Sequence, residues 1–266
     1  MRRLTLNLSS VILLSAPVFA QLAAPNASGV SLGHIHMIVA DPEPHKKLWV
    51  DIFGAQVTSA GTLEMLKLPG VFLMVAKGRT LPTEGSDGST VNHFGFLVKS
   101  YADTKAKLTA AGVGLATDNP ANKQLIANFP DKIRVEFTED AAMPGTIKFH
   151  HIHEVTTDQE PTRAWYVKTF GAAAGKRGEW PNAMVPGGEV DFRKGDTAQA
   201  PTKGRTLDHI GFEVHNLEAF CKKLEADGVK FDMPYRELPQ LAGLKIAFVI
   251  DPIGTRIELT EGLASH

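Results

Sequence analysis

The sequence has little of several features that would narrow its class. A single cysteine among 266 residues, Cys221, excludes an intramolecular disulfide and a zinc site built from several thiolates. The 28 Lys and Arg residues are balanced by 29 Asp and Glu residues, so no excess charge is available to attract nucleic acid or an anionic membrane. No stretch after the first twenty residues reaches the roughly 18 apolar residues that a membrane-spanning helix needs. Histidine, by contrast, is abundant: there are ten, and they require an explanation.

The first twenty residues have the pattern of a secretory signal. Met1-Arg2-Arg3 is a basic start, an apolar run follows, and Val18-Phe19-Ala20 places small residues at the −3 and −1 positions of a cleavage site. A buried amphipathic helix is the alternative interpretation. The sequence predicts removal of residues 1–20, a flexible lead-in over residues 21–30, and a soluble mature protein that is periplasmic or secreted.

The remainder of the chain contains an internal repeat. When His34–Ala55 is laid over His151–Ala172, ten of 22 positions are identical, including both histidines of each His-Ile-His sequence. The correspondence continues near His93 and His209 and in the segments that carry Glu136 and Glu258. This period is too long for a solenoid, whose repeats are about 20–50 residues. It predicts two homologous domains, residues 31–141 and 146–263.

Each predicted domain alternates strands and helices as two βαβββ units. The expected helices are Glu43–Phe53, Tyr101–Ala111, Glu160–Phe170 and Leu217–Asp227. The expected strands are His34–Val39, Leu63–Leu68, Val71–Ala76, His151–Val155, Ala183–Val185 and Glu189–Arg193, with further strands opening at His93 and His209 and final strands carrying Glu136 and Glu258.

Strand periodicity separates an apolar face from a polar one. In the strand around Ile210, alternate apolar residues share one face and leave His209 on the other. His151 and His153 likewise share a face, and Glu258 lies opposite apolar neighbours. The first repeat has the same arrangement, with its polar residues His34, His36, His93, Arg134, Glu136 and Thr138.

This polar face suggests a metal site. Two imidazoles and one carboxylate from three strands suit divalent Fe, Mn, Co, Ni or Zn and leave open positions for a substrate. For any single histidine, the alternative is an ordinary hydrogen-bonded strand residue. That alternative is weakened because the same His, His, Glu set returns in the second repeat.

The chain resembles the vicinal oxygen chelate superfamily, which contains glyoxalases, bleomycin-resistance proteins and extradiol dioxygenases. The residues that carry the resemblance are Leu207–Val214, Ala226–Val229 and Asp251–Leu259. The resemblance covers essentially the whole mature chain. It implies an α+β fold of two tandem domains, in which paired βαβββ modules form a cup-shaped, mostly antiparallel eight-stranded sheet with helices outside.

The resemblance also implies metal ligands. They would be His151, His209 and Glu258 in the second half and, by repeat, His34, His93 and Glu136 in the first. Glyoxalase I enzymes carry a fourth, carboxylate ligand near the end of the fourth strand, and the best match is Asp191. The position equivalent to Asp191 in the first half is Met74. A solvated strand edge is the alternative for Asp191.

The function implied is that of a metal-dependent enzyme with glyoxalase-like lyase or isomerase chemistry. Its substrate would be a small molecule with two vicinal oxygens, and His153 or Glu258 would shuttle the proton. An Fe(II)-dependent dioxygenase is an alternative, but extradiol dioxygenases carry a tyrosine where this chain has Phe248. A non-catalytic binding or resistance protein is the third possibility. We expect a monomer or homodimer that binds neither nucleic acid nor membrane.

Overall fold

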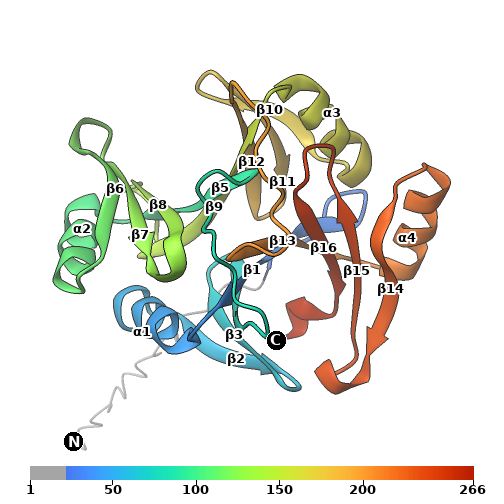
Figure 1. The fold of residues 1–266 in the computed structure, drawn as a ribbon, viewed down its shortest axis with the longest axis horizontal. Helices are drawn as coiled ribbons and strands as arrows, with labels where there is room; N and C mark the ends of the chain where they lie inside the picture. The colour runs from blue at the N-terminus through green and yellow to red at the C-terminus, as the bar shows by residue number, and fades with distance from the viewer. Residues whose placement is uncertain (1–21) are drawn as a thin grey trace, which may run out of the picture.

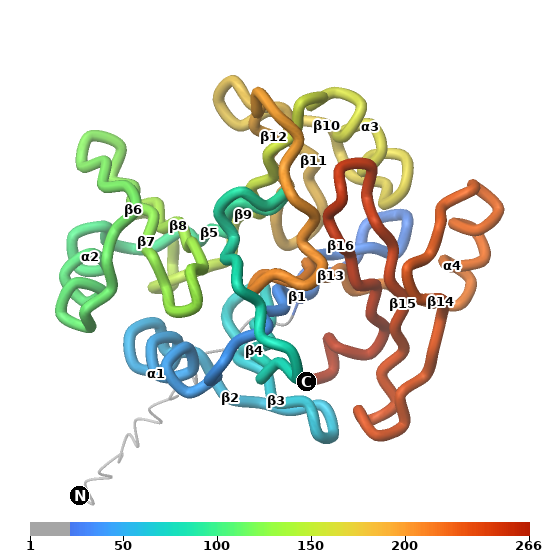
Figure 2. The backbone as a smooth tube through the Cα atoms, viewed as in Figure 1, coloured from blue at the N-terminus to red at the C-terminus, as the bar shows by residue number. Residues whose placement is uncertain are grey.

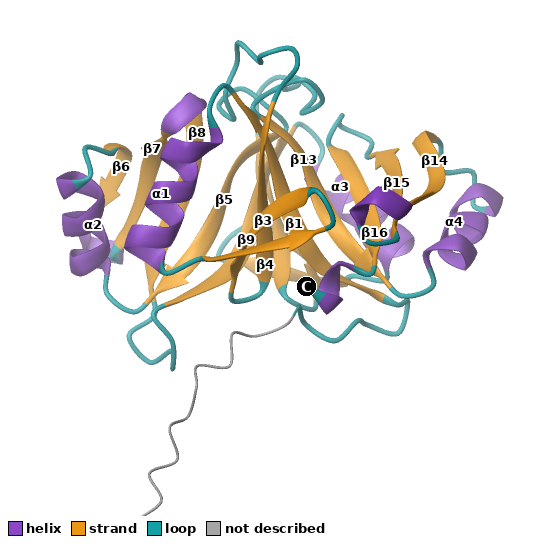
Figure 3. Ribbon diagram, turned by 90° about the horizontal axis from the view of Figure 1, so that it is seen from below, coloured by secondary structure: helices purple, strands orange, loops and turns teal. Residues whose placement is uncertain are grey.

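The computed structural model describes residues 22–266, so the predicted signal segment lies outside the described residues. Within these residues, sixteen strands form two sheets of eight strands each (Figure 1). Four α-helices of the described chain lie on the outer sides of the sheets (Figure 3). Within each sheet, parallel pairs flank a central antiparallel pair, and all other neighbours are antiparallel. The predicted α+β class and the eight-stranded sheets built from βαβββ modules are confirmed.

The described chain consists of four successive βαβββ modules. The first contains β1 (Val30–Val39), α1 (Pro42–Phe53), β2 (Gln56–Ala60), β3 (Leu63–Leu68) and β4 (Val71–Lys77). The second contains β5 (Val91–Val98), α2 (Tyr101–Ala110), β6 (Gly114–Asn119), β7 (Gln124–Phe129) and β8 (Ile133–Glu139). The third contains β9 (Ile147–Thr156), α3 (Gln159–Phe170), β10 (Ala173–Arg177), β11 (Trp180–Val185) and β12 (Gly188–Lys194). The fourth contains β13 (Leu207–Val214), α4 (Leu217–Ala226), β14 (Phe231–Leu238), β15 (Leu244–Ile250) and β16 (Arg256–Glu261), and short 3₁₀ turns lie at Pro120–Asn122, Pro130–Lys132, Pro239–Leu241 and Leu263–Ser265.

The modules that share a sheet are not consecutive halves of the chain. One sheet has the order β14-β15-β16-β13-β1-β4-β3-β2 and joins the fourth module to the first. The other has the order β10-β11-β12-β9-β5-β8-β7-β6 and joins the third module to the second. Neither repeated half therefore closes a sheet of its own. We call the polar faces of these sheets the first cup and the second cup, respectively.

The central antiparallel pairs bring histidines from different halves together. In the first cup, β1 pairs with β13, so His36 lies opposite His209 and His34 lies opposite Gly211. In the second cup, β5 pairs with β9, so His93 lies opposite His153. The expected grouping of ligands within each half is wrong, because the hydrogen-bonded sheets pair modules across the two halves.

Within each half, the two modules pack against each other through the apolar faces opposite the cups. The Trp49 ring on α1 lies 4.9 Å from the ring of Phe129, and that of Phe53 lies 4.8 Å from the ring of Phe137, so the first helix packs on the second module. In the second half, Phe170 on α3 lies 4.7 Å from Phe212 on β13. Each module thus has two partners: one through its sheet and the other through its buried apolar face.

The lead-in has specific contacts. The side chain of Asn26 donates hydrogen bonds to the carbonyls of Phe170 and Gly171, at 3.0 and 3.1 Å, at the end of α3. The backbone of Gly29 accepts from the amide of His215. The lead-in therefore contacts the second half through Asn26 and Gly29, and its flexibility stays a prediction. Between residues 22 and 266, no helix has the length and apolar character needed to span a membrane.

Candidate metal centres

The first cup contains a compact donor set of two imidazoles and one carboxylate. The Nε2 atoms of His34 and His209 each lie 2.9 Å from the same oxygen, Oε2 of Glu258. All three residues are buried, and each contributes a ligand atom within 4.8 Å of the others. They come from β1, β13 and β16, which are neighbours in the sheet. The three donors therefore converge on one point from three adjacent strands.

Hydrogen bonding fixes the orientation of His209. Its Nδ1 lies 2.7 Å from Oδ1 of Asp208, which is itself held by Arg256 at 2.9 Å. Because the carboxylate of Asp208 accepts a hydrogen bond from Nδ1–H, a neutral His209 points the Nε2 lone pair at Glu258. Lone pair and carboxylate repel unless a proton or a metal cation lies between them.

The pKa directions show that the carboxylates of this site favour a positive charge beside them. Burial alone would lower the pKa of His209, but its bonds to Asp208 and Glu258 raise it above its usual value. Burial alone would raise the pKa of Glu258, but hydrogen bonds from His209 and His34 hold it far below its usual range. Without a cation, the site therefore favours a protonated imidazole beside an ionised carboxylate.

The close approach of His34 depends on a glycine. A Cβ added to Gly211 would lie 2.0 Å from Cε1 of His34, so only glycine leaves room for the ring. Gly95 has the same role in the second cup, where an added Cβ would lie 2.2 Å from Cε1 of His151. The glycine in each of these strands is thus explained by the imidazole that packs on it.

The rest of the first cup is mainly apolar. Phe72 and Met74 lie beside His34 and His36 in the β1–β4 register. They belong to a small buried cluster, separate from the main core, that also includes Leu263 near the C-terminus. Figure 2 shows the C-terminus within the curl of this sheet. The Phe248 ring packs edge-on to His209, with centroids 5.0 Å apart.

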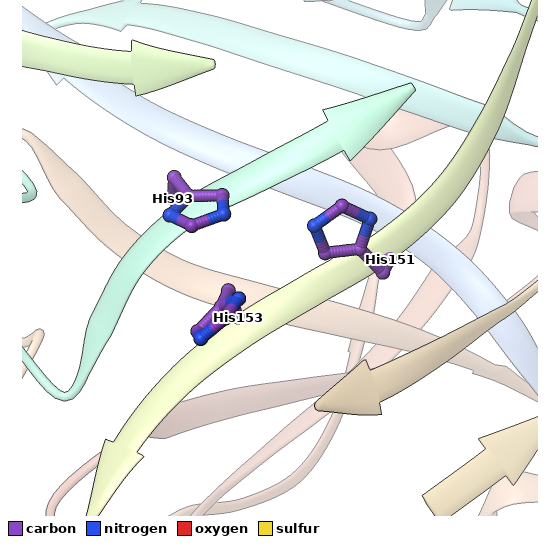
Figure 4. A group of neighbouring side chains, drawn as sticks. All are labelled: His93, His151 and His153. Atoms are coloured by element: carbon purple, nitrogen blue, oxygen red, sulfur yellow. The ribbon is translucent and has the colours of Figure 1, made fainter. Parts of the chain in front are cut away.

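The second cup holds three histidines close together. Figure 4 shows the ring of His93 on β5 and the rings of His151 and His153 on β9 around a common space. Each has a ligand atom within 4.8 Å of the others. Burial lowers the pKa of His153 to about 3, so this imidazole is neutral at physiological pH. Nε2 of His151 and both ring nitrogens of His153 are buried without a hydrogen-bond partner.

The glutamate of the second cup has more partners than that of the first. Oε2 of Glu136 lies 3.1 Å from Nε2 of His93, and the equivalent atoms of Glu258 and His209 are also close in the first cup. Oε1, however, accepts hydrogen bonds from Gln124 at 2.9 Å, Thr138 at 3.0 Å and Arg177 at 3.0 Å. Its distance to Nε2 of His151 is 3.7 Å.

Arg177 also holds Asp191. Its Nη1 donates to Oδ2 of Asp191 at 2.9 Å, while Nη2 holds Glu136. Glu189 approaches the same guanidinium, at 4.0 Å from Nε. Burial first and then Asp191 raise the pKa of Glu189 to about 7. One arginine therefore lies within ion-pair distance of the three carboxylates of this cup.

The structure places every predicted site residue on a cup face but divides them differently. The first cup contains His34, His209 and Glu258, and the second contains His93, His151, His153, Glu136 and Asp191. The predicted proton shuttles His153 and Glu258 are thus in different cups. The residue equivalent to His153 beside Glu258 is His36, whose ring centroid lies 4.4 Å from that of His209.

Two residues with evident roles were missed from the sequence. Asp208 directly precedes a predicted ligand, and an acidic neighbour of this kind is a recognisable signal for ligand orientation. Arg177 corresponds to Ala60 in the first repeat, so a comparison of cup-facing charges between the repeats would have found it.

A family model described as the Glyoxalase/Bleomycin resistance protein/Dioxygenase superfamily matches residues 148–259. This part of the chain belongs to this superfamily. The internal repeat and the two eight-stranded sheets fit two tandem domains of this kind. Members are typically metal-dependent, and the His34, His209, Glu258 group and the three-histidine group are the candidate metal sites.

Solved structures support the same fold. Glyoxalase I from Zea mays superimposes with a TM-score of 0.67 at 16% identity, covering 89% of this chain and 94% of that one. A putative dioxygenase from Bacillus subtilis gives 0.64 at 14% identity, covering 91% and 86%. At these identities the similarity concerns the fold alone. No curated protein matched the sequence.

The donor chemistry of the first cup fits a divalent cation. Two imidazole nitrogens and a carboxylate oxygen suit Fe, Mn, Co, Ni or Zn. Asp208 also provides the outer hydrogen bond that metal-ligating histidines normally make.

Proposed function

We propose that the protein is an exported, metal-dependent enzyme with glyoxalase-like lyase or isomerase chemistry, and that its reaction takes place in the first cup. The observation that supports this most strongly is the convergence of two imidazole nitrogens on one oxygen of Glu258, which forms no ion pair with a lysine or arginine among residues 22–266. Export is supported by the basic and apolar pattern of residues 1–20. The metal and the substrate class that we propose follow from the residues of this cup.

His34, His209 and Glu258 would hold a divalent cation, which would supply Lewis-acid chemistry for a substrate with two vicinal oxygens. His36 remains neutral, since burial and the neighbouring His209 lower its pKa to about 3. Both of its ring nitrogens lack a partner, so His36 can hydrogen-bond a polar substrate group. Glu258 receives its hydrogen bonds on Oε2, which leaves Oε1 to accept a proton.

The apolar residues of the first cup favour a particular kind of substrate. Phe248, Phe72 and Met74 are themselves uncharged. The Arg256 guanidinium that lies over the Phe248 ring is already paired with Asp208 and Asp232. The three apolar residues exclude water from the imidazoles and can contact a hydrocarbon substituent. We therefore expect a small α-hydroxycarbonyl compound, or a thiol adduct of a 2-oxoaldehyde, with an apolar substituent.

An Fe(II)-dependent dioxygenase is the second candidate. A His, His, Glu set is the donor set of many non-haem iron oxygenases, which favours this reaction class. Phe248 argues against the extradiol type, because its ring packs on His209 where those enzymes place a tyrosine hydroxyl. A non-catalytic binding protein is less well supported, because nothing in simple ligand binding requires the converging donor set.

Purification of the exported protein under native conditions, followed by elemental analysis, is the first test. The protein would then be incubated in D₂O with a panel of α-hydroxycarbonyl compounds and thiol adducts of 2-oxoaldehydes. Proton NMR would detect exchange of the carbon-bound hydrogen that an enediolate requires. Oxygen consumption with Fe(II) would instead support the dioxygenase.

Glu258→Gln is the informative variant, because it keeps the side-chain size and removes the charge. Glu218→Gln, on the exposed surface of α4, is the matched control. Loss of metal and exchange only in Glu258→Gln supports the proposal. Full metal content and full exchange in Glu258→Gln would rule out the first cup as the active site.

A further inference from the structure

Glu136 of the second cup is paired with an arginine, whereas Glu258 of the first cup pairs with no lysine or arginine among residues 22–266. Arg177 ends β10 and lies opposite Trp180 across the β10–β11 hairpin. Its repeat-equivalent, Ala60, ends β2 and lies opposite Leu63 in the same way. The guanidinium is therefore an addition to one cup, supplied by an edge strand, and its positive charge is permanent.

The position of this charge matters for metal binding. One guanidinium reaches Glu136 at 3.0 Å and Asp191 at 2.9 Å, through different nitrogens. A metal ion ligated by both carboxylates would have to lie between them, where Arg177 now lies. The Asp191 side chain is fully buried, and the Glu136 side chain is 6% exposed, so water does not substitute for this pairing.

No other group of the second cup replaces the carboxylate oxygens that Arg177 engages. Oε1 of Glu136 is also engaged by Gln124 and Thr138, which hold the carboxylate in its present rotamer. The group within 4.8 Å consists of three imidazoles, whereas the first cup's group includes its carboxylate. The second cup therefore lacks the free anionic oxygen that the first cup offers.

We infer that Arg177 takes the place of a metal ion in the second cup, so that each chain binds one divalent ion, in the first cup. The location of the single ion rests on the proposed function; the exclusion from the second cup rests on Arg177 alone. The second cup still holds the elements of a four-ligand site: His93, His151, Glu136 and Asp191. Removal of the guanidinium should free both carboxylates and create an N₂O₂ set suited to Zn, Ni or Co.

The test is the metal stoichiometry of the full chain, measured by elemental analysis after dialysis against Zn²⁺, Ni²⁺ or Co²⁺ and removal of free ion. We expect one ion in the wild type, two in Arg177→Gln, and one again in Arg177→Gln/Glu136→Gln. Arg177→Lys retains a positive charge and should remain at one ion. Circular dichroism and thermal unfolding would verify that each variant is folded, and Glu258→Gln reports separately on the first cup.

Two results would overturn the inference. One is a wild type with two ions, one of which is lost in Glu136→Gln. The other is a folded Arg177→Gln variant that stays at one ion. If Glu258→Gln leaves the ion content unchanged, the proposed function fails instead. A wild type without metal, together with one ion in Arg177→Gln, would retain the exclusion by Arg177 and refute the first-cup site.

Discussion

The two cups start from the same His, His, Glu pattern and differ in what surrounds the glutamate. Glu258 faces two imidazoles and lies opposite Phe248 in the β15–β16 register. Glu136 is bound to Arg177 and two neutral donors, in a cup with two further carboxylates. The comparison shows that a repeated ligand pattern does not guarantee a repeated site. The availability of the carboxylate decides which cup can hold a metal.

The largest expected difference is between the equivalent histidines of β13 and β5. We expect His209→Ala to lower metal affinity by at least about 100-fold and to abolish turnover, because a direct ligand is lost. His93→Ala removes the same group from the second cup and should leave the ion content at one per chain. Metal titration by calorimetry measures both. Equal losses in the two variants would show that the sites are equivalent or interdependent.

The residues that precede these histidines provide the second test. Asp208 is ionised, since its bond to His209 and its other partners hold its pKa far below its usual range against the effect of burial. Asp208→Asn should weaken metal binding about 10- to 100-fold, the usual cost of removing an outer partner. The equivalent residue is Asn92, whose Oδ1 lies 2.9 Å from Nδ1 of His93. Asn92→Ala should leave metal affinity unchanged, and a comparable loss there would contradict the assignment.

The glycines beside the histidines allow a test of structure against function. Gly211→Ala and Gly95→Ala each introduce a Cβ into an imidazole ring, and each should cost about 1–3 kcal/mol of unfolding free energy. Chemical denaturation would measure this cost in both variants. Only Gly211→Ala should also lose metal, because it displaces His34. Metal loss in Gly95→Ala as well would indicate that the second cup contributes to the site.

The smallest effect concerns the two cores. In the core of the second half, the Tyr166 hydroxyl lies 2.8 Å from Glu154 and 3.2 Å from Asp251. The equivalent residues of the first half have no carboxyl group; they are Trp49, Met37 and Phe129. Burial raises the pKa of Glu154 and raises that of Asp251 to about 6.

Raised carboxyl pKa values favour the protonated folded state, so this stability is present at low pH and is lost as pH rises through the folded pKa. For Asp251 the loss falls between about pH 4 and 6. Glu154→Gln removes one buried acid. Between pH 5 and pH 8, the unfolding free energy of the wild type should therefore decrease by at least about 1 kcal/mol more than that of the Glu154→Gln variant. Urea denaturation at both pH values measures this difference. An identical fall in both proteins would show that Glu154 does not titrate with folding.

Much of this arrangement could be predicted from residue patterns. Alternation along the strands placed His34, His93, His209 and Glu258 on polar faces, and the predicted bounds of all four helices lie close to their observed ends. The partnership of the modules could not be predicted, because four similar modules have compatible edges and local periodicity does not distinguish them. The role of Arg177 was equally inaccessible, since a long side chain on an edge strand reaches residues of another module.

The pairing of the modules has a consequence for the order in which the molecule is completed. The strands of the second cup lie between residues 91 and 194, enclosed in sequence by those of the first. His34 and Glu258 are 224 residues apart, so the outer site has its ligands only when β16 has joined the sheet. A chain that emerges from its N-terminus would close the arginine-containing cup first. Any ion in the first cup would then enter at the last step of folding, and a prematurely terminated chain would be unable to retain it.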